Sequence, residues 1–234
     1  MPASVIFVTV VIAVIGWWLL QQRLTAKPWL EEGVIGEFDG TGSMAAPAAK
    51  IAVWVLIAVI GSLFALLISA YLMRSGYPDW RPIIVPHLLW FNTGALVLTS
   101  VALYGAQRAV DRRRLDHVKA RIAASGFFGI AFVAGQLWAW REMTAAGNLV
   151  ATNPADSFFY LVTGLHGLHV LGGLIALAWT ANRTWRRFAP DKLRLNVELS
   201  AIYWHFMLVI WLILFSLLTG LAEDFGTICR QLLT

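Results

Sequence analysis

The chain has 234 residues, of which 59% are hydrophobic and only 13% are charged, and its mean hydropathy is +0.70. A soluble domain carries about 25% charged residues, so this composition excludes an ordinary soluble protein and indicates a polytopic membrane protein. The net charge of +5 does not indicate nucleic-acid binding, because the basic residues stand in short segments beside long apolar runs, and the single cysteine, Cys229, excludes a disulfide framework and a cysteine-based metal site.

Six apolar stretches reach or approach the roughly 20 residues that a membrane-spanning helix needs. In chain order they are residues 4–20, 51–73, 83–107, 122–140, 158–182 and 199–222. The first stretch is short, and Trp17 and Trp18 at its end are typical of side chains at a membrane interface. We therefore predict an all-α, polytopic membrane bundle with six transmembrane helices.

The segment of residues 31–47 is the one candidate linker. Its glycines, its proline and its four acidic residues disfavour a helix. The segment joins the first apolar stretch to the other five. We expect a first transmembrane helix in residues 1–24, a cytoplasmic linker in residues 25–49 and a five-helix transmembrane bundle in residues 50–234.

Lysine and arginine are distributed unequally between the two sides of this predicted bundle. The segments 23–50, 108–121 and 183–194 together hold 14 of these residues, and the other side holds 4. Basic loops stay in the cytoplasm, so we expect a multi-pass protein of the bacterial inner membrane with both termini in the periplasm. The segment 108–121 is best explained as a topogenic loop facing phospholipid headgroups, with a docking patch for a partner as the alternative.

Ionisable residues inside a membrane are candidates for function. The candidates are few: His87, His166, His169 and His205, with Glu142 and Glu198 near helix ends. No aspartate, lysine or arginine lies deep in a predicted span, which weighs against a proton pump or an ion-coupled transporter.

His166 and His169 lie in an uncharged stretch with glycines at 164, 167, 172 and 173. Residues three apart share one face of a helix, so the two imidazoles cannot bind opposite sides of one haem. A zinc or copper site would need further ligands, and no carboxylate stands beside the pair. We favour close helix packing at the glycines, with the imidazoles in interhelical hydrogen bonds, and the same reasoning applies to Tyr203, Trp204 and His205.

These segments resemble one known family. The stretch FFYLVTGLHGLHVLGG of residues 158–173, together with YWHFMLVIW of residues 203–211, is similar to subunit III of the haem-copper terminal oxidases, including cytochrome c oxidase. Further similarities to that family are Glu198, Gln136, Asn92 with Thr93, and the segment from Trp17 to Arg23. The resemblance covers nearly the whole chain.

The resemblance implies a non-catalytic subunit without an active site, haem or copper of its own. The haems and copper belong to partner subunits, and the chain packs against the catalytic subunit I and other oxidase subunits. Phospholipids would fill a cleft between the first helix and the five-helix bundle. Trp18, Arg23 and Arg183 match the family's lipid-headgroup contacts, and arginine suits this role because its planar group bonds phosphate oxygens in pairs.

Two positions depart from the family pattern. Ile60 and Ala139 stand where the family usually carries glutamates within helices, which puts a role in proton handling in doubt for this chain. The departures leave the complex open as a cytochrome c oxidase, a quinol oxidase or a nitric oxide reductase. Outside the family, the alternatives are a membrane subunit that binds its own haem b and a small transporter.

Overall fold

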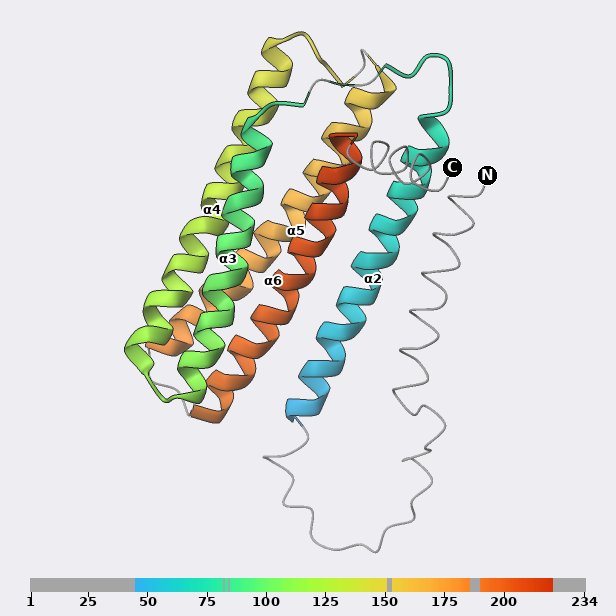
Figure 1. Cartoon of the computed structure of the whole chain (residues 1–234). Helices are drawn as coiled ribbons and strands as arrows, with labels where there is room; N and C mark the ends of the chain where they lie inside the picture. Colours follow the sequence, from blue (N-terminus) through green and yellow to red (C-terminus); the bar gives the residue numbers. More distant parts are fainter. Residues whose placement is uncertain (1–44, 82, 84, 151–152, 186–189, 221–234) are drawn as a thin grey trace, which may run out of the picture. The chain divides into compact units, whose positions relative to one another are not determined.

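The computed structural model describes residues 45–81, 83, 85–150, 153–185 and 190–220. Within these residues the chain is all-helical, without a strand, and has five α-helices (Figure 1): α2 (Ala45–Arg74), α3 (Leu88–Asp111), α4 (Leu115–Ala145), α5 (Pro154–Trp185) and α6 (Pro190–Leu218). The chain divides into two compact units, Met1–Pro47 and Ala48–Thr234. The predicted span of residues 4–20 and most of the predicted linker lie outside the described residues.

All five helices are long and apolar enough to cross a membrane, and this confirms five of the predicted spans as helices. Two of the predicted ends were wrong. α3 begins at Leu88 and not at residue 83, because Pro86 has no amide proton and disfavours a helical conformation at the residue before it. α6 ends at Leu218 and not at residue 222, and Gly220 follows with a φ of 74°, a conformation that glycine adopts at little cost after a helix end.

Four of the helices form a closed ring. α3 packs on α4 and α6, and α5 packs on the same two helices, so that each helix of the ring has two neighbours (Figure 1). α2 lies outside this ring and touches it through side chains. Phe64 of α2 lies against the rings of His166 and His169 on α5, and Gly61 faces the ring of Phe206 on α6 at van der Waals distance.

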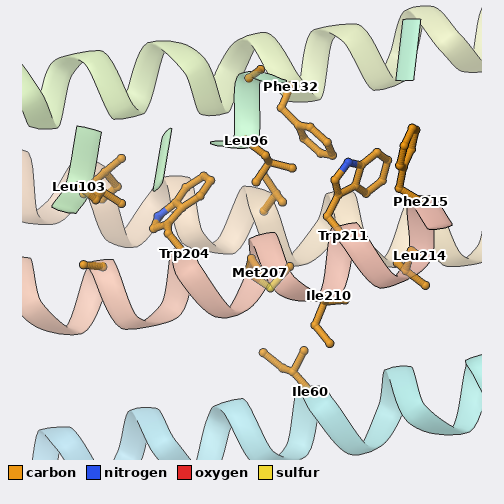
Figure 2. Close-up of a cluster of buried hydrophobic side chains, with 14 of the residues drawn as sticks. Ile60, Leu96, Leu103, Phe132, Trp204, Met207, Ile210, Trp211, Leu214 and Phe215 are labelled. Carbon is orange, nitrogen blue, oxygen red and sulfur yellow. The ribbon is translucent and has the colours of Figure 1, made fainter. Parts of the chain in front are cut away.

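The apolar core centres on α6. Its buried side chains recur every three or four residues, as a helix buried along one face requires, and Figure 2 shows them between the neighbouring helices: Trp204, Met207, Ile210, Trp211, Leu214 and Phe215. In the same view Ile60 of α2 points toward Ile210 of α6. Since lipid is as apolar as these side chains, the helices associate through packing and polar contacts more than through the hydrophobic effect.

The basic connections gather at one end of the bundle. The start of α2, the α3–α4 connection, the end of α5 and the start of α6 all lie at that end (Figure 1). Two ion pairs join these segments there, Lys50 Nζ with Glu198 Oε1 at 2.7 Å and Arg194 Nη2 with Asp111 Oδ1 at 3.2 Å. Among the described residues, Lys50, the α3–α4 connection and Arg194 thus lie at the same end of the bundle.

The opposite end is held by polar contacts between its connections. Asn153 Nδ2 donates to the carbonyl of Arg81 at 2.6 Å, which ties the α2–α3 connection to the start of α5. Arg74 Nη1 donates to Asp79 Oδ1 at 2.8 Å, and this hydrogen bond lowers the pKa of the exposed Asp79 carboxyl below its ordinary value.

Candidate functional site

His166 lies in the interior of the bundle and is fully buried. The rings of Trp211, Phe132 and Phe64 surround it, with centroid distances of 5.1, 5.6 and 6.1 Å. Neither ring nitrogen of His166 has a hydrogen-bond partner among the described residues. The imidazole therefore fills space between aromatic rings from three other helices, and it does not make the interhelical hydrogen bond expected from the sequence.

His169 lies one turn further along α5 and is half-buried. Its Nδ1 donates to the carbonyl of Leu165 at 2.8 Å within the same helix. The hydroxyl of Tyr203 on α6 donates to the backbone carbonyl of His169 at 2.8 Å. The tie between α5 and α6 at this point thus comes from Tyr203, whereas the imidazole bonds its own helix.

Trp204 occupies a slot between two glycines. A Cβ placed on Gly129 of α4 would lie 2.9 Å from Trp204 Cη2, and a Cβ on Gly173 of α5 would lie 3.3 Å from Trp204 Cε2 and 2.8 Å from Tyr203 Cε1. Contacts of 2.8 and 2.9 Å are shorter than carbon atoms accept and 3.3 Å is tight, so a side chain at Gly129 would displace the Trp204 ring and one at Gly173 would displace the Tyr203 ring and press on Trp204. α4, α5 and α6 approach each other closely at this slot, as small residues permit in membranes.

The glycines of α5 do not share one role. Gly173 lies against the rings of Tyr203 and Trp204, and Gly164 has the Trp140 ring at an ordinary 3.4 Å from a Cβ position. At Gly167 and Gly172 an added Cβ would meet nothing within 4 Å. Close helix packing therefore holds at Gly173 and not at the whole set that the sequence indicated.

Polar side chains link the ring helices at several further points. His205 Nδ1 and Ser100 Oγ are 3.0 Å apart, joining α6 to α3, and Trp211 Nε1 donates to Thr93 Oγ1 at 2.9 Å between the same helices. Asn92 Nδ2 donates to Gln136 Oε1 at 3.3 Å, which joins α3 to α4 inside the core. Each such contact stabilises a membrane protein by only about 0.6 kcal/mol on average. The main effect of these contacts is therefore to determine which faces of the helices pack together.

Glu198 pairs with Lys50, a residue that the sequence analysis did not single out. The ion pair joins α6 to α2, and both side chains are more than one third exposed. Such a pair contributes little free energy on a surface, but among the described residues it joins the first turns of α2 to the ring. Gly129 was missed as well, because Gly126 and Gly135 stand on the same helix and nothing in the sequence sets Gly129 apart from them.

A groove runs between α2, α5 and α6 with a volume of about 460 Å³. Its walls are mostly apolar, including Leu56, Leu168 and Trp179, with His169 and Tyr203 among its polar groups. Beyond Trp179, the guanidinium of Arg183 stacks on the indole at 3.8 Å from its centroid. Arg183 thus lies at the end of an apolar groove, near the basic end of the bundle.

The two positions that depart from the expected glutamates are buried in apolar surroundings. Ile60 is 4% exposed and Ala139 is 0% exposed. Both belong to the apolar core, so no carboxylate enters the ring at these points. Trp18 and Arg23 lie outside the described residues. Within the described residues, no three side chains of the His, Cys, Asp and Glu types gather as metal ligands would.

Comparison with known proteins agrees with this arrangement. The family model described as cytochrome c oxidase subunit III matches residues 67–219, which is more than half of the chain and runs from the second half of α2 to the end of α6. The proteins named cytochrome c oxidase subunit 3 from Synechocystis sp. and Thermostichus vulcanus are 31% and 30% identical, over 67% of this chain and 68% and 79% of their own lengths.

A mycobacterial relative is matched over a shorter part. The protein named probable cytochrome c oxidase subunit 3 from Mycobacterium tuberculosis is 32% identical over 127 residues, which is 54% of this chain and 62% of the relative. The chain thus spans less than two thirds of that relative's length. On the family match and the relatives from Synechocystis sp. and Thermostichus vulcanus together, this chain belongs to the cytochrome c oxidase subunit III family.

Proposed function

We propose that the chain is the non-catalytic subunit III of a haem-copper respiratory oxidase, in which oxygen reduction is coupled to proton pumping. In this role it has no active site, haem or copper of its own. It packs against the catalytic subunit I, stabilises it and holds structural phospholipids. The proposal rests on family membership and on the names of the relatives.

The main structural support for the proposal is that the histidines and the tyrosine inside the bundle make packing contacts and hydrogen bonds with neighbouring helices. His166 lies among aromatic rings, His205 contacts Ser100, and Tyr203 bonds the backbone at His169. Among the described residues these groups connect helices and do not converge on one point. A scaffold needs such contacts, whereas a redox centre needs converging ligands.

The groove supports the phospholipid part of the proposal. An acyl chain suits its apolar walls, and Arg183 beside Trp179 stands where a headgroup phosphate would lie. Trp18 and Arg23 would complete this headgroup site from the first helix, in residues 1–24. The cleft, the sixth span, the linker of residues 25–49 and the five-helix bundle of residues 50–234 are parts of the same proposal.

The oxidase assignment predicts the partners of the chain. When the tagged chain is purified from its native membrane, a catalytic subunit that contains haem and copper is expected to copurify, in about the same molar amount as the chain. Mass spectrometry of the copurified chains and haem extraction give the result. Recovery of the chain alone, or with a partner that lacks haem and copper, would overturn the assignment.

The proposed topology can be tested with the chain's single cysteine. Cys229 stands near the C-terminus, which we place in the periplasm of a bacterial inner membrane. A membrane-impermeant maleimide is expected to label it in intact spheroplasts. In a Cys229→Ser background, Arg113→Cys in the α3–α4 connection should react only after the membrane is opened, and the reverse pattern would invert the topology.

Ile60 and Ala139 stand where the family usually carries glutamates, and these substitutions support one alternative, an accessory subunit of a nitric oxide reductase. Ile60 and Ala139 supply no carboxylate to the interior, so this chain would also suit the accessory subunit of a nitric oxide reductase. Gas consumption by the purified complex distinguishes the two functions, because only an oxidase consumes oxygen with its electron donor at a rate that matches respiration. Nitric oxide consumption without oxygen consumption would favour the alternative.

A further inference from the structure

One carboxyl group lies inside the bundle. Asp156, in the first turn of α5, is 2% exposed. Among the side chains that the structure describes, it is the one aspartate, glutamate, lysine or arginine that is buried. Its neighbours Ala155 and Phe159 are buried as well, so this face of the first turn is closed to solvent. The start of α5 lies at the end of the bundle opposite the basic connections (Figure 1).

No group neutralises this carboxyl group within the described part of the chain. Its Oδ1 atom is buried and has no hydrogen-bond partner there. The three ion pairs between described residues join other side chains. Buried polar atoms are nearly always hydrogen-bonded, so an oxygen of this kind needs an explanation.

The neighbouring elements at this end of the bundle do not supply a counter-ion. Their described charged or titratable side chains are Tyr71, Arg74, Tyr77, Asp79, Arg81 and His87 from α2 and the α2–α3 connection, Arg141 and Glu142 from α4, and Tyr160 from α5. Arg74 pairs with Asp79, and the Tyr160 hydroxyl donates to the carbonyl of Asn148 at 2.8 Å. The other cationic and acidic side chains of this set are exposed. The described end of α6 carries no charged residue.

Burial without a partner makes the ionised form of Asp156 unfavourable. A carboxylate that leaves water costs far more free energy than a neutral acid, unless a cation or several donors face it. The start of a helix favours a negative charge, but this effect is smaller than the cost of a buried, unpaired charge. The neutral acid is therefore the form that fits the surroundings of Asp156.

We propose that Asp156 is a proton-binding site of the folded chain and is a neutral carboxylic acid at neutral pH. An aspartate of the unfolded chain is ionised at that pH, so folding takes up one proton at the start of α5. In the proposed topology this end faces the periplasm, and an acidic periplasm would stabilise the packing of α5. The proton site itself depends neither on the topology nor on which respiratory complex contains the chain.

The bound proton makes stability depend on pH. Above about pH 4, where an unfolded aspartate ionises, the wild type loses stability as the pH rises, until Asp156 ionises in the folded chain as well. Asp156→Asn keeps the shape of the neutral acid without a proton to lose. Its folding equilibrium relative to the wild type should therefore shift in its favour by about tenfold per pH unit in this range. Thermal unfolding of the two purified full chains measures the shift, and a difference that does not change with pH would contradict the proposal.

Infrared spectroscopy of the purified full chain in detergent detects the proton directly. At neutral pH the wild type is expected to show the carbonyl band of a protonated carboxylic acid, and Asp156→Asn should lack it. The control Glu142→Gln removes an exposed carboxylate at the same end of the bundle, and it should keep the band. Identical spectra of the wild type and Asp156→Asn in this region would overturn the proposal.

A measurement on the wild type alone keeps the proposal falsifiable if Asp156→Asn does not fold. With isotope-labelled carbon in the aspartate carboxyl groups, nuclear magnetic resonance at neutral pH should show one aspartate with the chemical shift of a protonated acid. The exposed aspartates, such as Asp79, Asp111 and Asp116, should have the shift of carboxylates. Carboxylate shifts for every aspartate of the chain would refute the proton site.

Discussion

Trp204→Ala is expected to lower the free energy of unfolding by about 2–3 kcal/mol. Soluble cores lose about 3–5 kcal/mol on such a truncation, but part of that cost is transfer from water, which has no counterpart between helices in lipid. The rest is lost contact around a fully buried indole that α4, α5 and α6 share. Thermal unfolding of the purified chain, followed by light scattering or by a fused fluorescent reporter, measures the change.

A glycine pair on α5 provides the matched control for this slot. Gly173→Ala forces a methyl group against the rings of Tyr203 and Trp204, and such overpacking costs about 1–3 kcal/mol. Gly172→Ala meets nothing within 4 Å, and it should be neutral or stabilising by up to about 1 kcal/mol, because alanine favours helices over glycine. Equal effects at the two neighbours would show that the indole slot does not hold the three helices together.

Filling the groove is expected to remove a tightly bound phospholipid. Gly172 lines the groove between α2, α5 and α6 and has open space at its Cβ position, so Gly172→Phe would occupy the place proposed for an acyl chain. Lipid extraction from the purified complex, with quantification by mass spectrometry, should find about one phospholipid fewer per chain. Gly167→Phe, on the same helix but outside the groove lining, serves as the control.

The headgroup side of the same lipid gives a second route to that result. Arg23→Ala combined with Arg183→Ala should lose the same phospholipid while turnover of the complex continues, because these residues hold lipid and not a reacting group. Retention of the full lipid complement in both the groove variant and the arginine variant would contradict the lipid site.

The sequence predicted the helices well because long apolar runs allow few other structures in a membrane. It predicted their ends less well. The third span continued the apolar pattern back to residue 83, and only the effect of Pro86 on the backbone moves the start of α3 to Leu88. Where the apolar run and the helix differ, a residue of special backbone geometry decides the boundary.

The rotation of each helix was harder to obtain, because a helix that is apolar all round carries no periodic signal for its buried face. For this reason the four glycines near the histidines looked equivalent, although Gly173 contacts Trp204 and Gly172 opens into the groove. The partners of polar groups are likewise set by rotation. The pairings of His205 with Ser100 and of Glu198 with Lys50 follow from which faces meet.

The basic segment 108–121 illustrates a third case. Charge counting explains why arginines lie at this end of the bundle, but it cannot predict whether they line a pocket or a flat surface. Gly105 of α3 lies beside Arg121 of α4, sixteen positions later in the chain, and both residues line a basic pocket of about 280 Å³ between the two helices. A tight turn between α3 and α4 brings them together.

The central claim is that His166 and His169 pack helices and bind no redox centre, and cofactor analysis of a double variant tests it most directly. We expect the complex that contains His166→Leu and His169→Leu to keep the wild-type haem and copper content per catalytic subunit and the wild-type optical spectrum, with less of this chain retained. Loss of one haem or one metal ion per chain, measured by pyridine extraction and elemental analysis of the purified complex, would contradict the claim.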